Sequence, residues 1–367
     1  MTYDYLIVGA GLYGATFAQQ AAAAGKTALV IDRRAHIAGN AYTEAVAGIA
    51  VHRYGAHIFH TDDDAVWQYV NRFARFNRFT NAPLANFHGQ LFHLPFNMNT
   101  FHALWGVTTP AAAQAKIDAQ RQTMAGRTPT NLEEQAIALV GTDLYRTLVK
   151  EYSEKQWGRD CRALPAFIIR RLPLRMTYDN NYFNDRHQGI PEAGYTALVA
   201  AMLADARITV KLNCDFLADR AALTALAKQV IYTGPIDAFF DYQLGALEYR
   251  ALRFETTVVD APNVQGNAVI NYTSHEVPYT RVIEHKHFTG VITPQSVLTR
   301  EYPEAWTRGK EPFYPVNDAA NTARLAQYQA LALALPHVHF GGRLGTYRYY
   351  NMDQVIRTAL DDWAAQV

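Results

Sequence analysis

The first 32 residues restrict the fold more strongly than any other part of the chain. An apolar run over residues 3–8 predicts a buried strand, and the small residues of 15–24 predict a helix that ends at Gly25. Residues 27–31 predict a second buried strand, which ends at Asp32. A glycine-rich turn, Gly-Ala-Gly-Leu-Tyr-Gly, separates the first strand from the helix. This succession of strand, glycine turn, helix, strand and acid is typical of a dinucleotide-binding unit.

The parts of this unit have separate roles in holding a dinucleotide. Glycines allow a tight turn and let backbone amides approach a pyrophosphate at the N-terminus of the helix. Asp32 lies 21 residues after Gly11, at a position from which a carboxylate accepts hydrogen bonds from ribose hydroxyls. The predicted cofactor contacts in this unit are Gly9, Gly11, Leu12, Tyr13, Gly14 and Asp32. An ordinary strand–helix–strand unit with a glycine-rich turn is the alternative.

Composition indicates a globular chain and excludes several classes of function. Of the 367 residues, 49% are hydrophobic and 18% are charged, which excludes a disordered chain and suits about two to three domains. The formal net charge of +1 argues against a dedicated nucleic-acid binder, so a bound anion needs a local cluster of cations. No apolar run reaches the roughly 18 residues that a membrane span needs.

Cysteine and histidine usage gives two further expectations. The only cysteines, Cys161 and Cys214, fit a reducing cytoplasm as the location of the protein. The thirteen histidines show no metal-ligand spacing, so no metal site is predicted. Two pairs alternate as neighbours along a strand do, namely His285 with His287 and His337 with His339.

The residues after the acid favour FAD over NAD as the dinucleotide. Residues 33–41 are basic and then small, which resembles the second fingerprint of the FAD-binding oxidoreductase superfamily, with Ala38 in place of one glycine. Two later segments suit the same fold: a strand and tight turn at 230–235, and a glycine turn at 340–343 before a helix-like stretch at 352–363. Further cofactor contacts are expected at Arg33, Gly39, Asn40, Thr233, Gly234 and Gly342.

The middle of the chain predicts helices followed by an antiparallel sheet. Helices are expected over 111–124 and 132–149, the second capped by Asn131, and residues 249–316 alternate as strands do. We therefore predict an α/β protein in which a discontinuous FAD-binding Rossmann-like domain holds an inserted helical domain and an antiparallel β-sheet domain. The expected boundaries are 1–80, 192–243 and 317–367 for the FAD-binding domain, 98–165 for the helical substrate and dimer domain, and 81–97, 166–191 and 244–316 for the sheet domain with a mobile loop.

Short blocks in a fixed order along nearly the whole chain carry a more specific resemblance. The most distinctive is Arg-Tyr-Gly-Ala-His-Ile-Phe-His-Thr at residues 53–61. The other blocks occupy residues 94–101, 151–158, 171–175, 179–183, 278–281, 313–316 and 342–352. Together they make the chain resemble the bacterial UDP-galactopyranose mutase family.

The resemblance implies an activity, a cofactor and partners. It implies an isomerase of the intramolecular transferase class, which interconverts the pyranose and furanose forms of UDP-galactose for cell-surface polysaccharide synthesis. It also implies three domains, a homodimer, and an FAD that is active in its reduced form although no net oxidation occurs. We hypothesise that N5 of reduced FAD is the covalent nucleophile at the anomeric carbon of the sugar.

A UDP-sugar needs fixed cations, because its diphosphate carries about two negative charges at neutral pH. Arginine suits this task because its planar fork meets a phosphate with two hydrogen bonds. The resemblance assigns the task to Arg171 and Arg281 and makes both catalytic, together with His60 and Arg343. Prolines interrupt the segment around Arg171, so residues 158–175 are expected to form a mobile lid.

Other side chains are assigned by the resemblance to the substrate or to the flavin. Predicted substrate contacts are Asn81, Tyr152, Ser153, Trp157, Tyr182, Asn271, Tyr314, Tyr349 and Asn351. Predicted flavin contacts are His57, Ile58, Arg343, Tyr350 and Met352. Tyrosines suit a diphosphate because a phenol donates one hydrogen bond without adding charge. Asn351 stands where the family usually has aspartate, which removes a charge without changing the size.

Three alternatives stay open at this point. An ordinary flavin oxidoreductase shares the FAD fingerprints, but it has no need of two diphosphate-binding arginines. A non-catalytic protein that binds nucleotide sugars and keeps FAD as a structural group draws support from Asn351 alone. A mutase of the same kind for another nucleotide sugar, such as UDP-N-acetylgalactosamine or a deoxy-sugar nucleotide, would share most of the predicted contacts.

Overall fold

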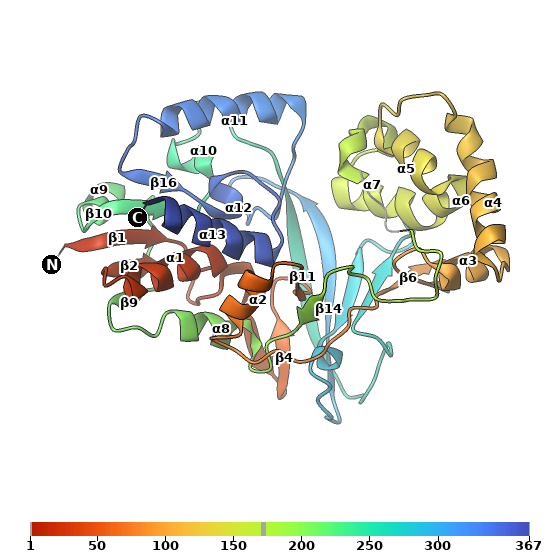
Figure 1. Ribbon diagram of the computed structural model, residues 1–367, viewed down its shortest axis with the longest axis horizontal. Coiled ribbons are helices and arrows are strands. Elements are labelled where there is room, and N and C mark those ends of the chain that lie inside the picture. Colours follow the sequence, from red (N-terminus) through yellow and green to blue (C-terminus); the bar gives the residue numbers. More distant parts are fainter. Residues whose placement is uncertain (1, 170–173, 367) are drawn as a thin grey trace.

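The computed structural model of the chain describes residues 2–169 and 174–366 and is built on two large sheets (Figure 1). The first sheet has the strand order β16-β10-β1-β2-β9, and all its neighbouring strands are parallel. Its strands are β1 (Tyr3–Val8), β2 (Ala28–Ile31), β9 (Ile208–Lys211), β10 (Ala227–Tyr232) and β16 (Val338–Phe340). The strands β1 and β2 lie where the two apolar runs predict them.

Helices cover both faces of the parallel sheet, because successive side chains of a strand point to opposite faces. Ile7 of β1 belongs to a core formed with helices on one face, whereas Leu6 belongs to the core on the other face. The first face carries α1 (Leu12–Ala23), α8 (Gly194–Met202) and α13 (Met352–Gln366), and the second carries α9 (Arg220–Thr224) and α10 (Ile236–Phe239). The predicted α/β fold with a Rossmann-like domain is therefore confirmed.

The second sheet has the order β15-β11-β14-β13-β12-β6-β7 and is antiparallel except between β12 and β6. Its strands are β6 (Leu84–Phe87), β7 (Gln90–His93), β11 (Tyr249–Val259), β12 (Val269–Tyr272), β13 (Arg281–Glu284), β14 (Ser296–Ala305) and β15 (Tyr314–Pro315). In its centre Arg281 is the register partner of both Asn271 and Glu301. Directly opposed residues share one face of a sheet, so these three polar side chains lie side by side.

Two expectations about this region are wrong. His285 and His287 are not neighbours along a strand, because β13 ends at Glu284 and residues His285–Phe288 form a 3₁₀ turn, η6. His285 and Phe288, three residues apart, are both buried, and this spacing suits a helical turn and not a strand. The strand pattern predicted over 249–316 also fails at residues 289–295, since β14 begins only at Ser296.

A third group consists of helices with a core of their own. Its members are α3 (Met98–Trp105), α4 (Pro110–Arg121), η2 (Gln122–Met124), α5 (Leu132–Val140), α6 (Thr142–Leu144), the π-helix η3 (Tyr145–Lys150), α7 (Glu151–Trp157), η4 (Cys161–Ala163) and η5 (Ala166–Ile169). Asn131 caps α5 as predicted, accepting a hydrogen bond from the Glu134 amide at 3.0 Å. The single helix expected over 132–149 is wrong, because Gly141 has a φ of +85° and ends α5.

These three groups occupy different parts of the molecule (Figure 1). The helical group lies at the opposite end from the parallel sheet, and the long strands β11 and β14 run between them. Smaller elements are η1 (Gly39–Ala41), β3 (Thr43–Val46), β4 (Ile49–His52), β5 (Phe59–Thr61), α2 (Asp64–Val70), β8 (His187–Gly189), α11 (Ala319–Ala332) and α12 (Gly342–Gly345). The residue boundaries expected for the three domains stay a prediction.

Residues 2–169 and 174–366 contain neither a membrane-spanning helix nor a cluster of metal ligands. No helix in that part of the chain is long and apolar enough to cross a membrane. Within the same residues no three histidine, cysteine, aspartate or glutamate side chains form a group that could hold a metal ion. The cysteines Cys161 and Cys214 are both free thiols.

Candidate cofactor and substrate site

Two cavities meet at the junction of the three groups. The dinucleotide cavity, of about 970 Å³, lies at the carboxyl ends of β1, β2 and β10, and the second cavity, of about 1000 Å³, lies between the helical group and the antiparallel sheet. Six residues line both cavities, namely Tyr182, Asn271, Arg281, Glu301, Tyr314 and Tyr349. Ligands in the two cavities would therefore meet at this shared wall.

The glycine turn after β1 forms a cradle in which Gly9 and Gly14 leave no room for side chains. A Cβ on Gly9 would lie 2.0 Å from Thr233 Oγ1, and a Cβ on Gly14 would lie 2.0 Å from the carbonyl oxygen of Gly9. A Cβ on Gly11 would meet only the Cα of Gly39, at 3.8 Å, so this part of the turn is open to the cavity. Bare backbone at the N-terminus of a helix fits the pyrophosphate of a dinucleotide.

The acid at the end of β2 holds this turn in place. Asp32 accepts hydrogen bonds from the amides of Ala10 and Arg34, both at 2.9 Å. Ala38, which replaces a glycine of the FAD fingerprint, has a φ of +71° and is buried. An alanine in this left-handed conformation costs roughly 1 kcal/mol or more, which explains why glycine is common there.

The basic residues after Asp32 contact the loop that precedes β15. Arg33 and Arg34 bind the two oxygens of the Glu311 carboxylate at 2.5 and 2.8 Å. Two residues further on, the carbonyl of Phe313 accepts a hydrogen bond from Arg343 Nη2 at 2.8 Å. The Nε of Arg343 is buried and has no hydrogen-bond partner within residues 2–169 and 174–366. A buried donor without a partner beside the cavity suits a polar cofactor atom.

Two histidines line the dinucleotide cavity: His57, which precedes β5, and His60, which lies within β5. His57 Nδ1 lies 2.8 Å from the carbonyl of Gly55, and burial lowers the pKa of this imidazole to about 4. His57 is therefore neutral at physiological pH. His60 Nδ1 lies 2.8 Å from the Asp185 carboxylate, and its ring stacks on Phe183 with centroids 3.7 Å apart. Both imidazoles are thus held in one orientation.

The shared wall is centred on Arg281. Its Nε donates to Asn271 Oδ1 at 3.1 Å, its Nη1 lies 3.6 Å from Glu301, and its Nη2 donates to the Tyr152 hydroxyl at 3.4 Å. Burial opposes the charge of Arg281, but Glu301 and Tyr152 raise its pKa, so the guanidinium stays protonated. A permanent cation at the junction of two cavities is suited to an anionic ligand.

Tyrosine hydroxyls surround this cation. Burial raises the pKa of Tyr152, Tyr182 and Tyr314, so all three remain phenols that can donate hydrogen bonds. Tyr314 and Tyr349 face each other with ring centroids 5.7 Å apart, and the Arg343 guanidinium lies 5.2 Å from the centroid of the Tyr349 ring. The wall therefore combines a fixed positive charge with neutral donors.

Aromatic side chains of α7 line one side of the second cavity. Tyr152, Ser153 and Trp157 line it from this helix, and Phe96 and Phe167 line it from the neighbouring segments. Arg250 of β11 donates from Nε to the carbonyl of Gln156 at 2.8 Å, near the end of α7. This arrangement offers a planar, apolar lining next to a cationic wall, which can accept a nucleotide base and its phosphates.

The structure groups the predicted residues as follows. The residues that line the dinucleotide cavity are Gly9, Gly11, Leu12, Tyr13, Asp32, Arg33, Gly39, Asn40, His57, Ile58, His60, Asn81, Thr233, Gly234, Gly342, Arg343, Tyr350, Asn351 and Met352. Those that line the second cavity are Tyr152, Ser153 and Trp157, and those on the shared wall are Tyr182, Asn271, Arg281, Tyr314 and Tyr349. Asn81 and Asn351, predicted as substrate contacts, thus lie on the cofactor side. Gly14 packs behind the turn, against Gly9.

Two residues fall outside this comparison: Arg171, which was predicted but is not described, and Glu301, which lines the shared wall but was not predicted. Arg171, together with the part of the expected lid at 170–173, lies outside the described residues. Glu301 is the wall residue that sequence reasoning missed, and it is almost fully buried. A carboxylate in the strand-like region 249–316 is a candidate partner for Arg281, but the sequence does not set the register that pairs these two residues.

Comparison with known proteins identifies relatives over nearly the whole chain. A family model described as UDP-galactopyranose mutase matches residues 147–349, and one described as a NAD(P)-binding Rossmann-like domain matches residues 7–73. A probable UDP-galactopyranose mutase of Klebsiella pneumoniae is 42% identical over 97% of this chain and 93% of its own length. A dTDP-fucopyranose mutase of Escherichia coli is 38% identical over 97% and 96%.

A solved structure has the same fold. A crystal structure of reduced UDP-galactopyranose mutase superimposes with a TM-score of 0.76, covers 99% of this chain and 93% of its own, and is 15% identical in sequence. This likeness extends over both sheets and the helical group, because the coverage is nearly complete.

Proposed function

The chain belongs to the UDP-galactopyranose mutase family, and from this premise we propose that it interconverts UDP-galactopyranose and UDP-galactofuranose. The predicted resemblance and the mutase class of isomerase are confirmed by the family model and by the related sequences. The predicted FAD-binding Rossmann-like domain is confirmed as well. The observation that carries the proposal is the position of Arg281, a buried cation on the wall between a dinucleotide cavity and a second cavity of similar volume.

The residues around the dinucleotide cavity fit FAD. The open backbone at Gly11 would receive the pyrophosphate, and Asp32 would receive the ribose. The Nε of Arg343, which has no hydrogen-bond partner among the described residues, would meet the flavin end. Reduced FAD, when bound, would supply the nucleophile N5 for the anomeric carbon of the sugar. The neutral His57 would border the flavin without adding a charge to it.

The second cavity would hold the uridine and the diphosphate. Tyr152 and Trp157 would contact the base, and Arg281 with the hydroxyls of Tyr182 and Tyr314 would bind the phosphates. When the bond between sugar and UDP breaks, negative charge grows on the departing diphosphate. Glu301 lies beside Arg281 and keeps it protonated, so Arg281 stabilises the negative charge on the diphosphate without having to reorganise. Walls of aromatic side chains exclude water, which would otherwise compete for the anomeric carbon.

A second candidate substrate is a dTDP-linked deoxy-sugar. It is favoured by one observation, the 38% identity to a dTDP-fucopyranose mutase over nearly the full length of both chains. The same cation, phenols and aromatic lining would serve either nucleotide. Asn351, on the cofactor side of the site, is the residue at which this chain departs from the usual family pattern.

A direct assay tests the proposal. The purified protein is reduced with dithionite and incubated with UDP-galactofuranose in one reaction and with dTDP-fucopyranose in another, and the products are separated by chromatography. We expect UDP-galactopyranose from the first reaction and a rate at least about tenfold lower in the second. Faster conversion of the dTDP-sugar would replace the proposed substrate. Equal turnover by oxidised protein would contradict the role of reduced FAD.

We also propose a homodimer located in the cytoplasm. The two free cysteines support this location, since a disulfide is uncommon in reducing compartments. Light scattering during size-exclusion chromatography should give about twice the 41.1 kDa of one chain, and a mass near one chain would contradict the dimer.

A further inference from the structure

Two lysines have their ammonium groups enclosed by backbone carbonyls, in different parts of the molecule. Lys155 Nζ donates to the carbonyls of Tyr272, Val277 and Tyr279 at 2.7, 3.3 and 3.0 Å. Lys286 Nζ donates to the carbonyls of Pro262, Thr293 and Gln295 at 2.6, 2.9 and 3.0 Å. Lysine is seldom buried without a carboxylate partner. Here Lys286 is buried and Lys155 is partly buried, and backbone carbonyls accept from both ammonium groups.

The cage of Lys155 connects the two walls of the second cavity. Lys155 is part of α7, which carries Tyr152 and Trp157, and its three carbonyl partners belong to the end of β12 and to the loop that leads to β13. The strand β12 carries Asn271 and β13 begins at Arg281. The ammonium group therefore joins the helix that lines the base side to the hairpin that lines the phosphate side.

Further polar contacts close the same junction. Glu151 of α7 accepts a hydrogen bond from the amide of His275 at 2.5 Å, and Glu154 lies 3.0 Å from the ring of His275. Thr273 donates to the carbonyl of Thr147 at 3.0 Å. Burial lowers the pKa of Lys155 to about 8, while Glu151 acts in the opposite direction. Among these contacts, the ammonium of Lys155 alone holds three carbonyls at once, so its loss would leave three acceptors without their donor.

We propose that Lys155 is a positioning residue for the nucleotide: it sets the separation between Tyr152 and Arg281 and thereby tunes the binding of a nucleoside diphosphate, with little effect on the cofactor. The Tyr152 hydroxyl and Arg281 Nη2 are 3.4 Å apart, a long hydrogen bond that a small movement of α7 would break. The base and the diphosphate are covalently joined in one ligand of limited length, so a shift between their subsites costs affinity for the whole nucleotide. This inference rests on the proposed function, since it takes UDP as the ligand.

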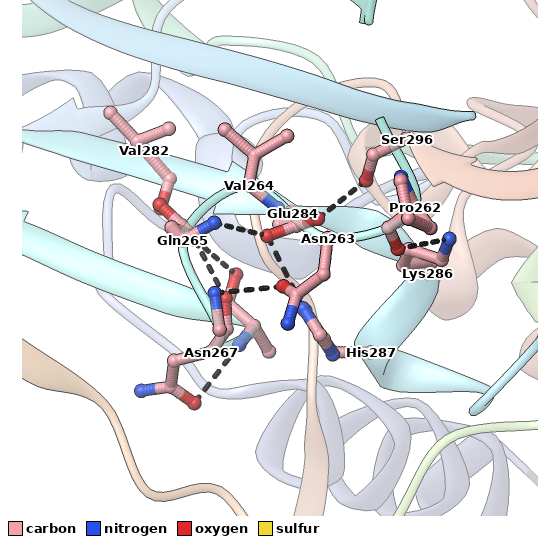
Figure 2. A network of polar contacts seen from close by, with 12 residues as sticks. Pro262, Asn263, Val264, Gln265, Asn267, Val282, Glu284, Lys286, His287 and Ser296 are labelled. Atoms are coloured by element: carbon pink, nitrogen blue, oxygen red, sulfur yellow. Dashed lines mark hydrogen bonds and ion pairs between the residues drawn. The ribbon is translucent and has the colours of Figure 1, made fainter. Parts of the chain in front are cut away.

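Lys286 supplies a matched control. It belongs to η6 and ties the segment at 262 to the loop around 293–295, next to the buried carboxylate of Glu284. Figure 2 shows this network, in which Glu284 accepts hydrogen bonds from Ser296 and from the amides of Val264 and Gln265. Lys286 is not among the described residues that line either cavity. Its removal therefore breaks the same kind of cage away from the nucleotide.

The experiment compares Lys155→Met with Lys286→Met in the FAD-loaded enzyme. We measure the melting temperature, the flavin content, the Kd of UDP by calorimetry, and kcat and KM for UDP-galactofuranose. Both variants should melt at a lower temperature and keep their flavin. Lys155→Met should raise the Kd of UDP and the KM by about 10- to 100-fold with kcat changed less than about threefold, whereas Lys286→Met should leave the Kd of UDP unchanged.

A milder variant and the wild type distinguish failure of the inference about Lys155 from failure of the proposed substrate. Lys155→Arg, which keeps the charge and several donors, should recover most of the UDP affinity, and it keeps the test valid if Lys155→Met does not fold. Equal effects of the Lys155 and Lys286 variants on the Kd of UDP, or no effect of either, would overturn the inference. Wild-type enzyme that binds dTDP and not UDP would overturn the proposed substrate, and the same comparison is then made with dTDP. Binding of neither nucleotide by the wild type would overturn both proposals.

Discussion

The two cavities of this protein differ in whether backbone or side chains shape them. The dinucleotide cavity is shaped mainly by backbone, with the turn at Gly9 and Gly11 exposing peptide groups at the start of α1. The second cavity is shaped by side chains, with Arg281 and Tyr152 approaching each other from a strand and a helix 129 residues apart in sequence. A backbone cradle is specified by a short local motif. A side-chain wall depends on the packing of segments that are distant in the chain.

Substitution of the turn glycines should have the largest effect and tests the backbone side of this comparison. A methyl group on Gly14 would press against the carbonyl of Gly9 at 2.0 Å, so Gly14→Ala should prevent the turn from forming and lower activity by more than about 1,000-fold. Gly11→Ala meets no close protein atom and should leave the apoprotein stable, but weaken FAD binding about 100-fold. Flavin absorbance and thermal melting measure both effects. Full FAD retention by Gly11→Ala would mean that side chains, and not backbone, hold the cofactor.

Removal of Arg281 tests the side-chain wall. Arg281→Ala should keep FAD bound, because the contacts that hold the cofactor cradle lie elsewhere. Loss of a buried, charge-assisted contact should raise the barrier by roughly 2–4 kcal/mol, which lowers kcat/KM by about 30- to 1,000-fold. Arg281→Lys should recover little, because a point charge does not reproduce the fork and cannot reach Asn271, Glu301 and Tyr152 together. Full activity with lysine would rule out two-point recognition of phosphate.

Three desolvated histidines should make the fold sensitive to acid, and one of them, His57, lines the dinucleotide cavity. Burial lowers the pKa of His57 to about 4 and that of His285 to about 3, and it lowers the pKa of His52 well below its usual value. Between pH 6.5 and 4 the unfolded chain binds protons at these histidines and the folded chain does not, so the free energy of unfolding falls as the pH falls. The loss for His57 alone is about 3 kcal/mol. Urea unfolding at a series of pH values measures the summed fall in the free energy of unfolding, with the exposed His337→Gln as control. Constant stability down to pH 4.5 would contradict the buried, neutral histidines.

The smallest effect is expected at Asn351, which lines the dinucleotide cavity close to the start of α13. Asn351→Asp adds a negative charge near a helix N-terminus, which should stabilise the fold by about 0.3–1 kcal/mol. The same charge should oppose the diphosphate and raise KM by about two- to fivefold. Thermal melting and steady-state kinetics with the UDP- and dTDP-sugars check both effects. A change of substrate preference greater than about tenfold would mean that Asn351 determines which sugar nucleotide is used, which contradicts the small effect expected here.

The sequence predicted the elements of the dinucleotide-binding unit closely, and it predicted the helical group and the antiparallel sheet only in part. The strands at 3–8 and 27–31 and the cap at Asn131 follow from local rules and agree with the structure. The expected helix over 132–149 and the strand placement of His285 are wrong, because Gly141 and the packing of η6 override the local pattern. For the site, residues such as Tyr314 and Tyr349 were assigned by resemblance alone. No local pattern indicates that they face each other.

Glu301 shows what local reasoning leaves out. It reaches the shared wall because β14 pairs with β13 in a register that sets Glu301 opposite Arg281. Register follows from the packing of the whole sheet and is not visible in either strand alone. The carbonyl cage of Lys155 was missed for the same reason, since a backbone acceptor leaves no mark in the sequence of the loop that supplies it.

The parallel sheet combines the earliest and the latest parts of the chain. Its central strand is β1, and the helix α13 covers it, with Trp363 packed against Tyr5 and Phe17 at ring-centroid distances of 5.8 and 5.4 Å. A ribosome needs roughly 20–70 s to make the chain between these two elements. During that time the glycine turn after β1 lacks the cover that α13 provides. Because α13 also lines the dinucleotide cavity, the cavity is complete only once the last residues have been made, and a chain truncated before α13 should not retain FAD.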